Sequence, residues 1–161
     1  MATVYLSLGT NIGNKEKQMN EAIERIETQI GDVVSRSTFY VTEPWGFESE
    51  NSFLNAVVKI ETELSADEVL KETQNIEREM GRMEKSEKGK YKDRIIDIDI
   101  LMYGTSIIDS PNLTIPHKFM KERRFVLEPL AEIASEVVIP GTDISVSKAL
   151  NLLIHKAKSD Q

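Results

Sequence analysis

Apolar residues follow two different spacings in the first part of the chain. Residues 4–8 alternate between apolar and less apolar side chains, which predicts a strand. A helix is predicted between an N-cap at Asn14 and a C′ glycine at Gly31. Its apolar face would consist of Met19, Ala22, Ile23, Ile26 and Ile30. Two further strands are predicted over residues 33–41 and 53–62, where β-branched or alternating apolar residues gather.

The middle of the chain predicts a second helix and a fourth strand. Ser65 and Glu68 have the spacing of a capping box, so the helix should begin there and end at Gly81. Its apolar face would consist of Val69, Thr73, Ile76 and Met80. Residues 82–93 are almost entirely polar and predict a long loop, and residues 94–103 predict a strand.

The last third of the chain predicts mostly helical structure. Residues 113–117 should form a short extended segment, and residues 120–134 should be helical in part, with an interruption at Pro129. A final helix would bury a regular apolar face made of Val146, Ala149, Leu150, Leu153 and Ile154.

These elements follow one another in the order β-α-β-β-α-β, with a C-terminal helical extension. The order is typical of a ferredoxin-like α+β fold, in which helices cover one face of a mostly antiparallel sheet. Because no repeat, low-complexity segment or linker divides the sequence, we expect a single domain over residues 1–161.

Composition narrows the classes of function. The 161 residues include 20 Lys and Arg against 27 Asp and Glu, and a net charge of −7 argues against a general binder of nucleic acid or anionic membrane. The sequence has no cysteine, which excludes disulfides, thiolate metal sites and cysteine nucleophiles. No stretch approaches the roughly 18 apolar residues of a membrane span, and the N-terminus does not resemble a signal peptide. We therefore expect a cytoplasmic protein without nucleic-acid or membrane partners.

Two acids in the fourth predicted strand carry the strongest chemical signal. In the segment Ile96-Asp97-Ile98-Asp99-Ile100 the isoleucines should face the core, and both aspartates should face the other way. Their Cα atoms would be about 6.6 Å apart, at roughly 3.3 Å a residue. Two like charges on one strand face repel each other, so a cation between them is a reasonable explanation. Hard oxygen ligands suit Mg²⁺, although an incidental pair on a solvated face is an equal alternative.

Arginines flank the polar loop before these acids. Between Arg82 and Arg94, both included, six basic residues stand against three acidic ones, in a chain that is acidic overall. Such a segment fits a lid that closes over a polyphosphate, or simply a solvated loop. Arg94 would supply a cation for phosphate beside the acids, whereas Arg82 could merely neutralise the end of a helix.

Three more groups of candidates have both functional and structural explanations. The first is Gln74 and Glu77, a polar pair on one helix face. The second is His117 with Arg123 and Arg124 nearby, which could contact phosphate or a nucleobase. The third is Phe53, Asn55 and Phe125, which could hold a flat heterocycle. Polar helix faces are usually solvated, single histidines are more often structural, and phenylalanines usually belong to a core. Sequence spacing alone leaves these alternatives open.

Short motifs nevertheless recur through almost the whole chain in a fixed order. They are Leu8-Gly9-Thr10-Asn11, Phe39-Tyr40, Thr42-x-Pro44, Phe53-Leu54-Asn55, Gln74-x-x-Glu77, Gly81-Arg82, Arg94-x-x-Asp97-Ile98-Asp99-Ile100, Pro116-His117 and Met120-Lys121-x-Arg123-x-Phe125. In this order the chain resembles the 6-hydroxymethyl-7,8-dihydropterin pyrophosphokinases of folate biosynthesis.

The resemblance implies a reaction and a metal site. Members of this family transfer the β,γ-pyrophosphoryl group of ATP to the hydroxymethyl group of the pterin and release AMP. By this resemblance Asp97 and Asp99 would hold two Mg²⁺ ions, which would orient the substrate hydroxyl for in-line attack on the β-phosphorus. Arg82 and Arg94 would neutralise charge on the transferred group and on the leaving AMP.

The resemblance also assigns the residues that would bind the two substrates. The nucleotide site would be lined by Gln74, Glu77, Ile98, Thr114, His117 and Arg123. The pterin would stack between Phe53 and Phe125. Its hydrogen-bonding edge would be recognised by Asn55 and by backbone groups around Thr42, Pro44, Trp45 and Gly46. A monomer is expected.

Several positions depart from the usual pattern of this family. Glu84 stands where many members have a second arginine, Lys92-Asp93 where a small residue and often proline precede the arginine, and Lys118 where an aromatic residue often follows the histidine. These departures concern loop closure more than the class of reaction.

Two other functions are alternatives to the pyrophosphokinase. A non-catalytic ferredoxin-like module that binds a small ligand would have no need of two acids together with two arginines. A two-metal phosphate-ester hydrolase would need a group that positions water, and the sequence offers no clear candidate.

Overall fold

The computed structural model describes residues 1–42, 52–81 and 95–159. Their centre is a five-stranded sheet in the order β2-β4-β1-β5, with β3 paired to β4 beyond the end of β2, and every pairing is antiparallel. The strands are β1 (Ala2–Thr10), β2 (Asp32–Arg36), β3 (Tyr40–Thr42), β4 (Phe53–Thr62) and β5 (Asp97–Tyr103). Helices α1 (Lys15–Gln29) and α2 (Ala66–Gly81) complete the β-α-β-β-α-β unit, so the predicted ferredoxin-like α+β fold is confirmed.

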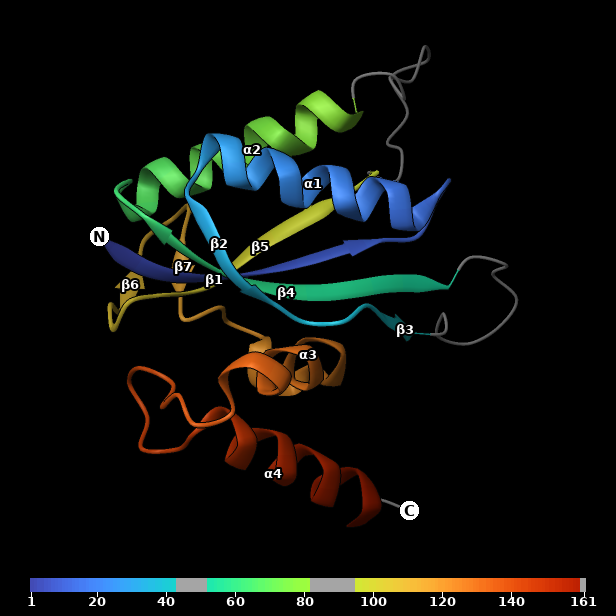
Figure 1. Cartoon of the computed structure of the whole chain (residues 1–161). Coiled ribbons are helices and arrows are strands. Elements are labelled where there is room, and N and C mark those ends of the chain that lie inside the picture. Colours follow the sequence, from blue (N-terminus) through green and yellow to red (C-terminus); the bar gives the residue numbers. More distant parts are fainter. Residues whose placement is uncertain (43–51, 82–94, 160–161) are drawn as a thin grey trace.

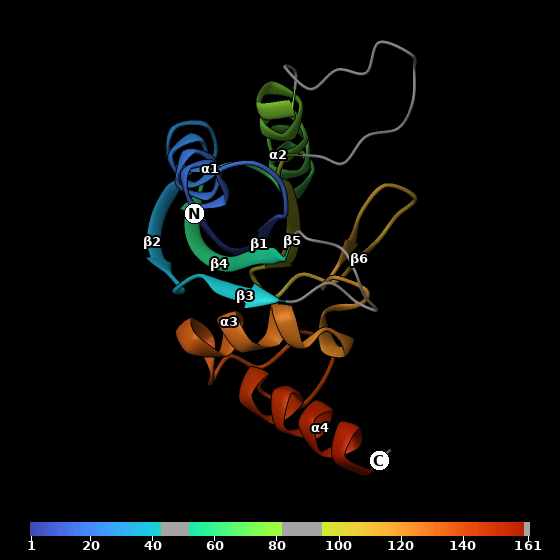
Figure 2. The same ribbon diagram turned by 90° about the vertical axis from the view of Figure 1, so that its right-hand side faces the viewer.

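The sheet lies between two helical layers (Figures 1 and 2). Helices α1 and α2 cover one face, where Leu6, Ile26 and Ile76 are fully buried. On the other face lies α3 (Arg124–Ala134), and α4 (Val146–Ser159) packs on α3. Tyr5 and Val57 point from the sheet into this second core. The C-terminal extension therefore supplies the layer that encloses the second sheet face.

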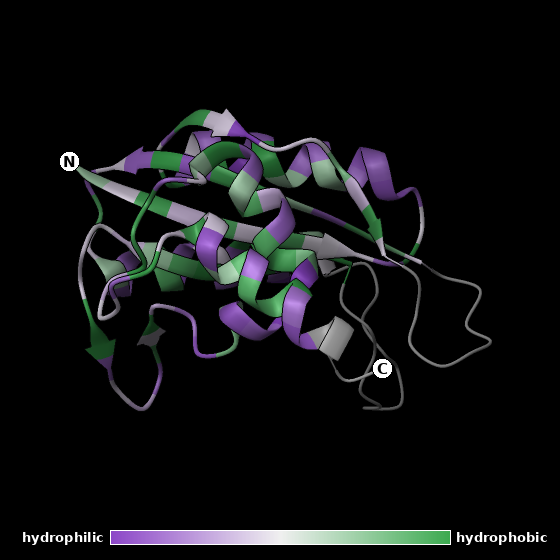
Figure 3. Ribbon diagram, turned by 90° about the horizontal axis from the view of Figure 1, so that it is seen from below, coloured by the Kyte–Doolittle hydropathy of each residue, from purple (hydrophilic) through white to green (hydrophobic). Residues whose placement is uncertain are grey.

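Figure 3 looks onto this second layer from below, and hydrophobic and hydrophilic residues alternate in short blocks along its helices. Within the described residues, no helix combines the length and the hydrophobicity that crossing a membrane requires.

The second predicted strand is divided into β2 and β3. Ser37 lies at the division: its N–H donates to the carbonyl of Val57, and its Oγ accepts from the N–H of Val57, at 2.9 and 3.0 Å. From Arg36 to Tyr40 the chain advances four residues while β4 advances three, so one extra residue interrupts the ladder. The apolar pattern gives no sign of this irregularity.

The N-terminal caps predicted for α1 and α2 are confirmed by their hydrogen bonds. The Asn14 side chain accepts from the N–H of Lys17 at 3.2 Å. Ser65 and Glu68 form the reciprocal capping box, with distances of 2.8 Å from the Ser65 N–H to the Glu68 carboxylate and 3.2 Å from the Glu68 N–H to the Ser65 hydroxyl.

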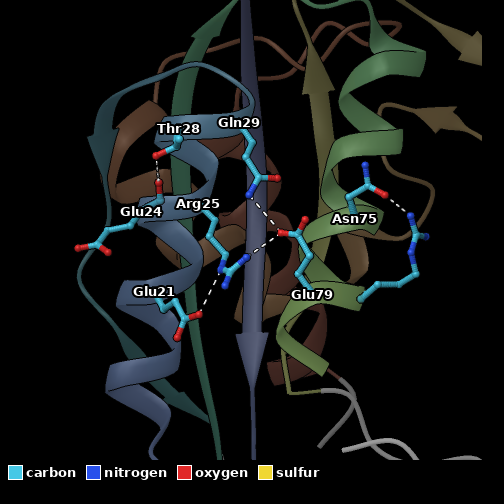
Figure 4. A network of polar contacts seen from close by, with 8 residues as sticks. Glu21, Glu24, Arg25, Thr28, Gln29, Asn75 and Glu79 are labelled. Carbon is cyan, nitrogen blue, oxygen red and sulfur yellow. Dashed lines mark hydrogen bonds and ion pairs between the residues drawn. The ribbon is translucent and has the colours of Figure 1, made fainter. Parts of the chain in front are cut away.

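The two helices are joined on their outer surfaces by side-chain contacts (Figure 4). Glu79 of α2 accepts from Arg25 at 2.7 Å and from Gln29 at 3.2 Å, and Arg25 also pairs with Glu21 at 3.1 Å. Exposed ion pairs of this kind contribute at most about 1 kcal/mol each. Their main effect is to fix how α2 lies beside α1.

The interruption predicted at Pro129 is wrong, because α3 continues from Arg124 to Ala134 through this residue. Proline inside a helix costs about 3 kcal/mol through the lost hydrogen bond and the ring clash. The same turns bury Val126, Leu127 and Leu130, each worth about 1.5–3 kcal/mol. Burial of this face outweighs the local cost.

The segment between β5 and α3 contains structure that the pattern indicated only in part. The short strands β6 (Ile108–Asp109) and β7 (Thr114–Ile115) pair with each other, and η2 (Met120–Glu122) is a single 3-10 turn before α3. The extended segment expected at residues 113–117 contains β7, whereas strands of two residues are too short to show a period in the sequence. β5 begins at Asp97, later than the predicted start.

Glu132 attaches α3 to the point where β2 ends and β3 begins. Its carboxylate accepts from the N–H and the hydroxyl of Thr38 at 3.1 and 3.0 Å, and from the Tyr40 hydroxyl at 2.9 Å. Burial raises the pKa of Glu132, but these hydrogen bonds outweigh that effect and hold the pKa below its ordinary value. The contact thus fixes the C-terminal half of α3 against the sheet at neutral pH.

Gly31 occupies the predicted C′ position, but for a different reason than predicted. Its backbone is not left-handed, since the positive φ angles among the described glycines belong to Gly13, Gly104 and Gly141. A Cβ at Gly31 would instead lie 2.3 Å from the carbonyl oxygen of Glu61. The glycine is needed where the chain passes close to the backbone of β4.

We expect Gly31→Ala to destabilise the fold by about 1–3 kcal/mol, because a methyl group would push the α1–β2 connection away from β4. Gly81→Ala is the matched control, since a Cβ there meets no described atom within 4 Å. Chemical denaturation of both variants checks the prediction, and a Gly31→Ala variant as stable as the parent would contradict it.

Candidate active site

The two acids of β5 lie on the same face of the sheet, as the alternation predicts. Ile98 and Ile100 are 4% and 5% exposed and pack into the core under α1 and α2, whereas Asp97 and Asp99 are exposed on the opposite face. Across the central strand, Gly9 pairs with Asp97 and Ser7 with Asp99. Because paired residues share a face, the absent side chain of Gly9 leaves space beside Asp97.

The first cleft, which we call the aromatic cleft, opens above these acids and has a volume of about 660 Å³. Its walls come from β1, β3, β4, β5 and the start of α3. Four residues that the sequence assigned to a heterocycle site line it together with Asp97 and Asp99: Thr42, Phe53, Asn55 and Phe125. Phe53 and Phe125 are 36% and 39% exposed, so both side chains are accessible where they line the cleft.

Asn55 is the buried polar group of this cleft. It is 6% exposed, and its Nδ2 donates to the Thr42 hydroxyl at 2.8 Å. It pairs with Gly9 across the sheet, and a Cβ on Gly9 would lie 3.1 Å from the Asn55 Oδ1. Gly9 therefore makes room for the amide, and the Thr42 hydroxyl holds its orientation.

The second cleft, which we call the histidine cleft, has a volume of about 430 Å³ and lies along the outer side of β5. Its walls include four residues that the sequence assigned to a nucleotide site, namely Ile98, Thr114, His117 and Arg123. Asp99 and Arg123 line both clefts. The acid and the arginine thus mark the place where two separate binding volumes meet.

Arg123 lies between two aromatic rings, one from each cleft. Its guanidinium carbon is 5.3 Å from the centroid of the Phe119 ring and 5.7 Å from that of Phe125. The Lys118 ammonium group is also near Phe119, at 5.4 Å. Phe119 and Lys118 line the histidine cleft but were not predicted, because the irregular segment between β7 and α3 has no period that would indicate which side chains face inward.

His117 is fixed by its own backbone and by that of its neighbour. Its N–H donates to the carbonyl of Leu101 at 2.9 Å, and its ring Nδ1 accepts from the N–H of Phe119 at 3.1 Å. Burial lowers the pKa of His117; Asp99 raises it and Arg123 lowers it, and the net pKa lies below 6.5. At neutral pH the ring is uncharged, and its proton is on Nε2 because Nδ1 accepts a hydrogen bond.

Gln74 and Glu77, assigned to the nucleotide site, line neither cleft. Gln74 is exposed on α2. Glu77 is half-buried behind β5, where its Oε2 accepts from the N–H of Ile98 at 2.8 Å.

Five of the expected site residues lie outside the described part of the chain: Arg82, Arg94, Pro44, Trp45 and Gly46. The lid expected between the two arginines lies outside it as well.

The chemistry of the acids fits a hard divalent cation. Among the described residues, no three His, Asp or Glu side chains gather closely enough to form a metal site by themselves. Two neighbouring carboxylates on one strand face match the way proteins bind Mg²⁺, through one or two carboxylates together with water and substrate phosphates. Asp97 and Asp99 therefore fit a metal that a phosphate-bearing ligand would share.

Proteins similar to this chain are known from both sequence and structure. Residues 5–135 match the family model described as 7,8-dihydro-6-hydroxymethylpterin-pyrophosphokinase (HPPK). A 2-amino-4-hydroxy-6-hydroxymethyldihydropteridine pyrophosphokinase of Porphyromonas gingivalis is 49% identical over 135 residues, covering 83% of this chain and 92% of the relative. The Haemophilus influenzae protein of the same name is 40% identical over 158 residues, covering 97% of this chain and 96% of the relative.

Two longer proteins are similar to this chain over part of their length. The folic acid synthesis protein fol1 of Pneumocystis carinii is 40% identical over 151 residues, and the match spans 94% of this chain but 20% of fol1. The wild-type HPPK-DHPS structure of Plasmodium falciparum aligns with a TM-score of 0.79 at 16% identity, covering 99% of this chain and 46% of the other. At this identity the alignment shows the shared fold.

The charges around His117 give a prediction that does not depend on any ligand. Asp99→Asn removes an anion that favours the protonated ring, so the pKa of His117 should fall further; Arg123→Gln removes a cation, so that pKa should rise. NMR titration of the ring protons measures both shifts, and His155→Gln assigns the signals because the sequence has 2 histidines. A rise in the Asp99→Asn variant would contradict the electrostatic arrangement.

Proposed function

Since the chain belongs to the 7,8-dihydro-6-hydroxymethylpterin-pyrophosphokinase family, we propose that its two clefts bind the two substrates of that reaction. The chain is an ATP-dependent pyrophosphokinase of folate biosynthesis. It transfers the pyrophosphoryl group of ATP to the hydroxymethyl group of 6-hydroxymethyl-7,8-dihydropterin. The observation that supports the assignment of clefts is their meeting at Asp99 and Arg123.

The aromatic cleft would bind the pterin. Phe53 and Phe125 each present a ring to it, and a flat heterocycle stacks well on such faces. Asn55 and Thr42, joined by a hydrogen bond of 2.8 Å, would recognise the polar edge of the pterin. A ligand lacking that edge would leave the buried amide unpaired, which is costly, so this pair would favour the correct substrate. Backbone groups around Pro44, Trp45 and Gly46 would complete the recognition.

The histidine cleft would bind ATP. His117, neutral and protonated on Nε2, would donate a hydrogen bond to a phosphate oxygen without adding a charge. Ile98 and Thr114 would contact the nucleoside. Arg123, at the meeting point of the clefts, would contact the phosphate chain near the transferred group.

Asp97 and Asp99 would hold Mg²⁺ between the clefts, and we propose two ions. When bound, the metal supplies positive charge that polarises the phosphate oxygens and orients them. The pterin hydroxyl oxygen would attack the β-phosphorus while the bond from that phosphorus to the α–β bridging oxygen breaks. AMP would leave with the bridging oxygen, and the hydroxyl proton would pass to solvent. Arg82 and Arg94 would neutralise the charge that develops on AMP and on the transferred group.

Family membership gives no support to the non-catalytic module or to the phosphate-ester hydrolase. We infer that the chain acts as a monomer. We also infer a single domain, since residues as far apart in the sequence as Ser7 and Phe125 line the same cleft. A cytoplasmic location would fit its use of ATP.

The decisive assay mixes the protein with ATP, Mg²⁺ and 6-hydroxymethyl-7,8-dihydropterin and measures the nucleotide released. We expect AMP, whereas ADP or no nucleotide product would contradict the proposed reaction.

Asp97→Asn and Asp99→Asn should each lower kcat at least about 100-fold, because each removes a charge from the metal site. Both side chains are exposed, so circular dichroism and thermal unfolding should change little. Asp109→Asn is the control, because Asp109 is exposed on β6 and lines neither cleft. Full Mg²⁺-dependent turnover in either acid variant would defeat the metal assignment.

A further inference from the structure

Two outer strands of the sheet, β5 and β2, each have a backbone N–H bonded to a glutamate from a helix. On β5, the Ile98 N–H donates to Oε2 of Glu77 from α2 at 2.8 Å. On β2, the Val33 N–H donates to Oε1 of Glu27 at the end of α1, at 3.0 Å. In the described part of the chain, each of these strands has a strand neighbour on one side, β1 for β5 and β4 for β2. The two glutamates thus replace a missing strand at opposite edges.

On β5, the hydrogen bond from Ile98 to Glu77 involves the peptide group that joins Asp97 to Ile98. The N–H of Ile98 is in the same rigid plane as the carbonyl of Asp97, and Asp99 follows directly. Holding that N–H therefore restrains the backbone rotation that aims the Asp97 side chain, and it fixes the start of β5. The Ile98 side chain, 4% exposed in the core, restrains the same residue from its other end.

Glu77 itself is carried by a well-anchored helix. One turn of α2 places Ile76 and Met80 in the core, and Glu79 binds Arg25 and Gln29 of α1 (Figure 4). The glutamate thus has a fixed base from which it can hold the strand. Its hydrogen bond to the Ile98 N–H is a direct contact between α2 and the strand that carries both acids.

We propose that Glu77 is a positioning residue, which holds the β5 backbone at Ile98 so that Asp97 and Asp99 present their carboxylates together to the metal. The inference rests on the proposed function of these two acids. Groups that orient metal ligands typically change activity by about 10–100-fold when they are removed. The loss should appear in kcat, because a misaligned metal pair impairs the transition state more than it impairs binding of either substrate.

The test compares removal of the glutamate acceptor at the edge strand β5 with removal of the glutamate acceptor at the edge strand β2. Glu77→Ala removes the acceptor, whereas Glu77→Gln keeps an oxygen within reach of the Ile98 N–H. Glu27→Ala is the matched control, because it removes the same kind of contact from the edge that carries no site residue. Steady-state kinetics for ATP and for the pterin, Mg²⁺ activation curves, amide hydrogen exchange at Ile98 and thermal unfolding are measured for all variants.

We expect Glu77→Ala to lower kcat about 10–100-fold with both KM values within about threefold, and to need more Mg²⁺ for half-maximal rate. Amide exchange at Ile98 should accelerate. Glu77→Gln should recover kcat to within about threefold of the parent, and Glu27→Ala should leave kcat unchanged.

Three outcomes would overturn the proposal. In the first, Glu77→Ala keeps the kcat of the parent. In the second, Glu77→Ala raises only the KM for ATP, which would mean that Glu77 contacts the nucleotide directly. In the third, Glu77→Gln loses as much kcat as Glu77→Ala, which would mean that the negative charge of Glu77 is required. The Asp99→Asn variant distinguishes an error in the positioning role of Glu77 from an error in the proposed function of the two acids. If Asp99→Asn is inactive while Glu77→Ala is normal, the acids serve the reaction and only the positioning role is wrong.

Discussion

The pairing of β1 with β4 on one side and β5 on the other is the constraint on which the site depends. It places Asp97 beside Gly9 and Gly9 beside Asn55, so an acid, a gap and an amide lie in one row across the sheet. A slip by one residue would turn every side chain of β5 to the other face, burying both acids and exposing the isoleucines. Burial of Ile98 and Ile100 therefore fixes the chemistry on the opposite face.

Features governed by local spacing could be predicted from the sequence. Alternation in β5 indicated that Asp97 and Asp99 share a face, and the spacing of Ser65 and Glu68 indicated a reciprocal cap that the structure contains. Predictions from local spacing were wrong where packing between distant segments determines the structure. Pro129 is tolerated because its helix buries an apolar face, and Gly31 is required by the backbone of β4 rather than by its own turn.

The composition of the clefts could not be derived from spacing at all. Thr42, Asn55 and Phe125 line one cleft because β3, β4 and helix α3 of the second layer converge there. Glu132 holds that helix to the sheet through Thr38 and Tyr40. Residue type suggested Asn55 and Phe125, and resemblance to a family added Thr42. Neither indicated Phe119, which lines the histidine cleft because of the irregular path of residues 116–119. Such convergence is a property of the fold, and no single segment encodes it.

The shared arginine has a thermodynamic consequence for the two clefts. A heterocycle that stacks on Phe125 competes with the Arg123 guanidinium for that ring, and a phosphate beside Asp99 competes for the same cation. Occupancy of one cleft then changes the free energy of occupying the other, and by reciprocity the effect is equal in both directions. The affinities measured for the separate substrates would accordingly not sum to the stability of the ternary complex.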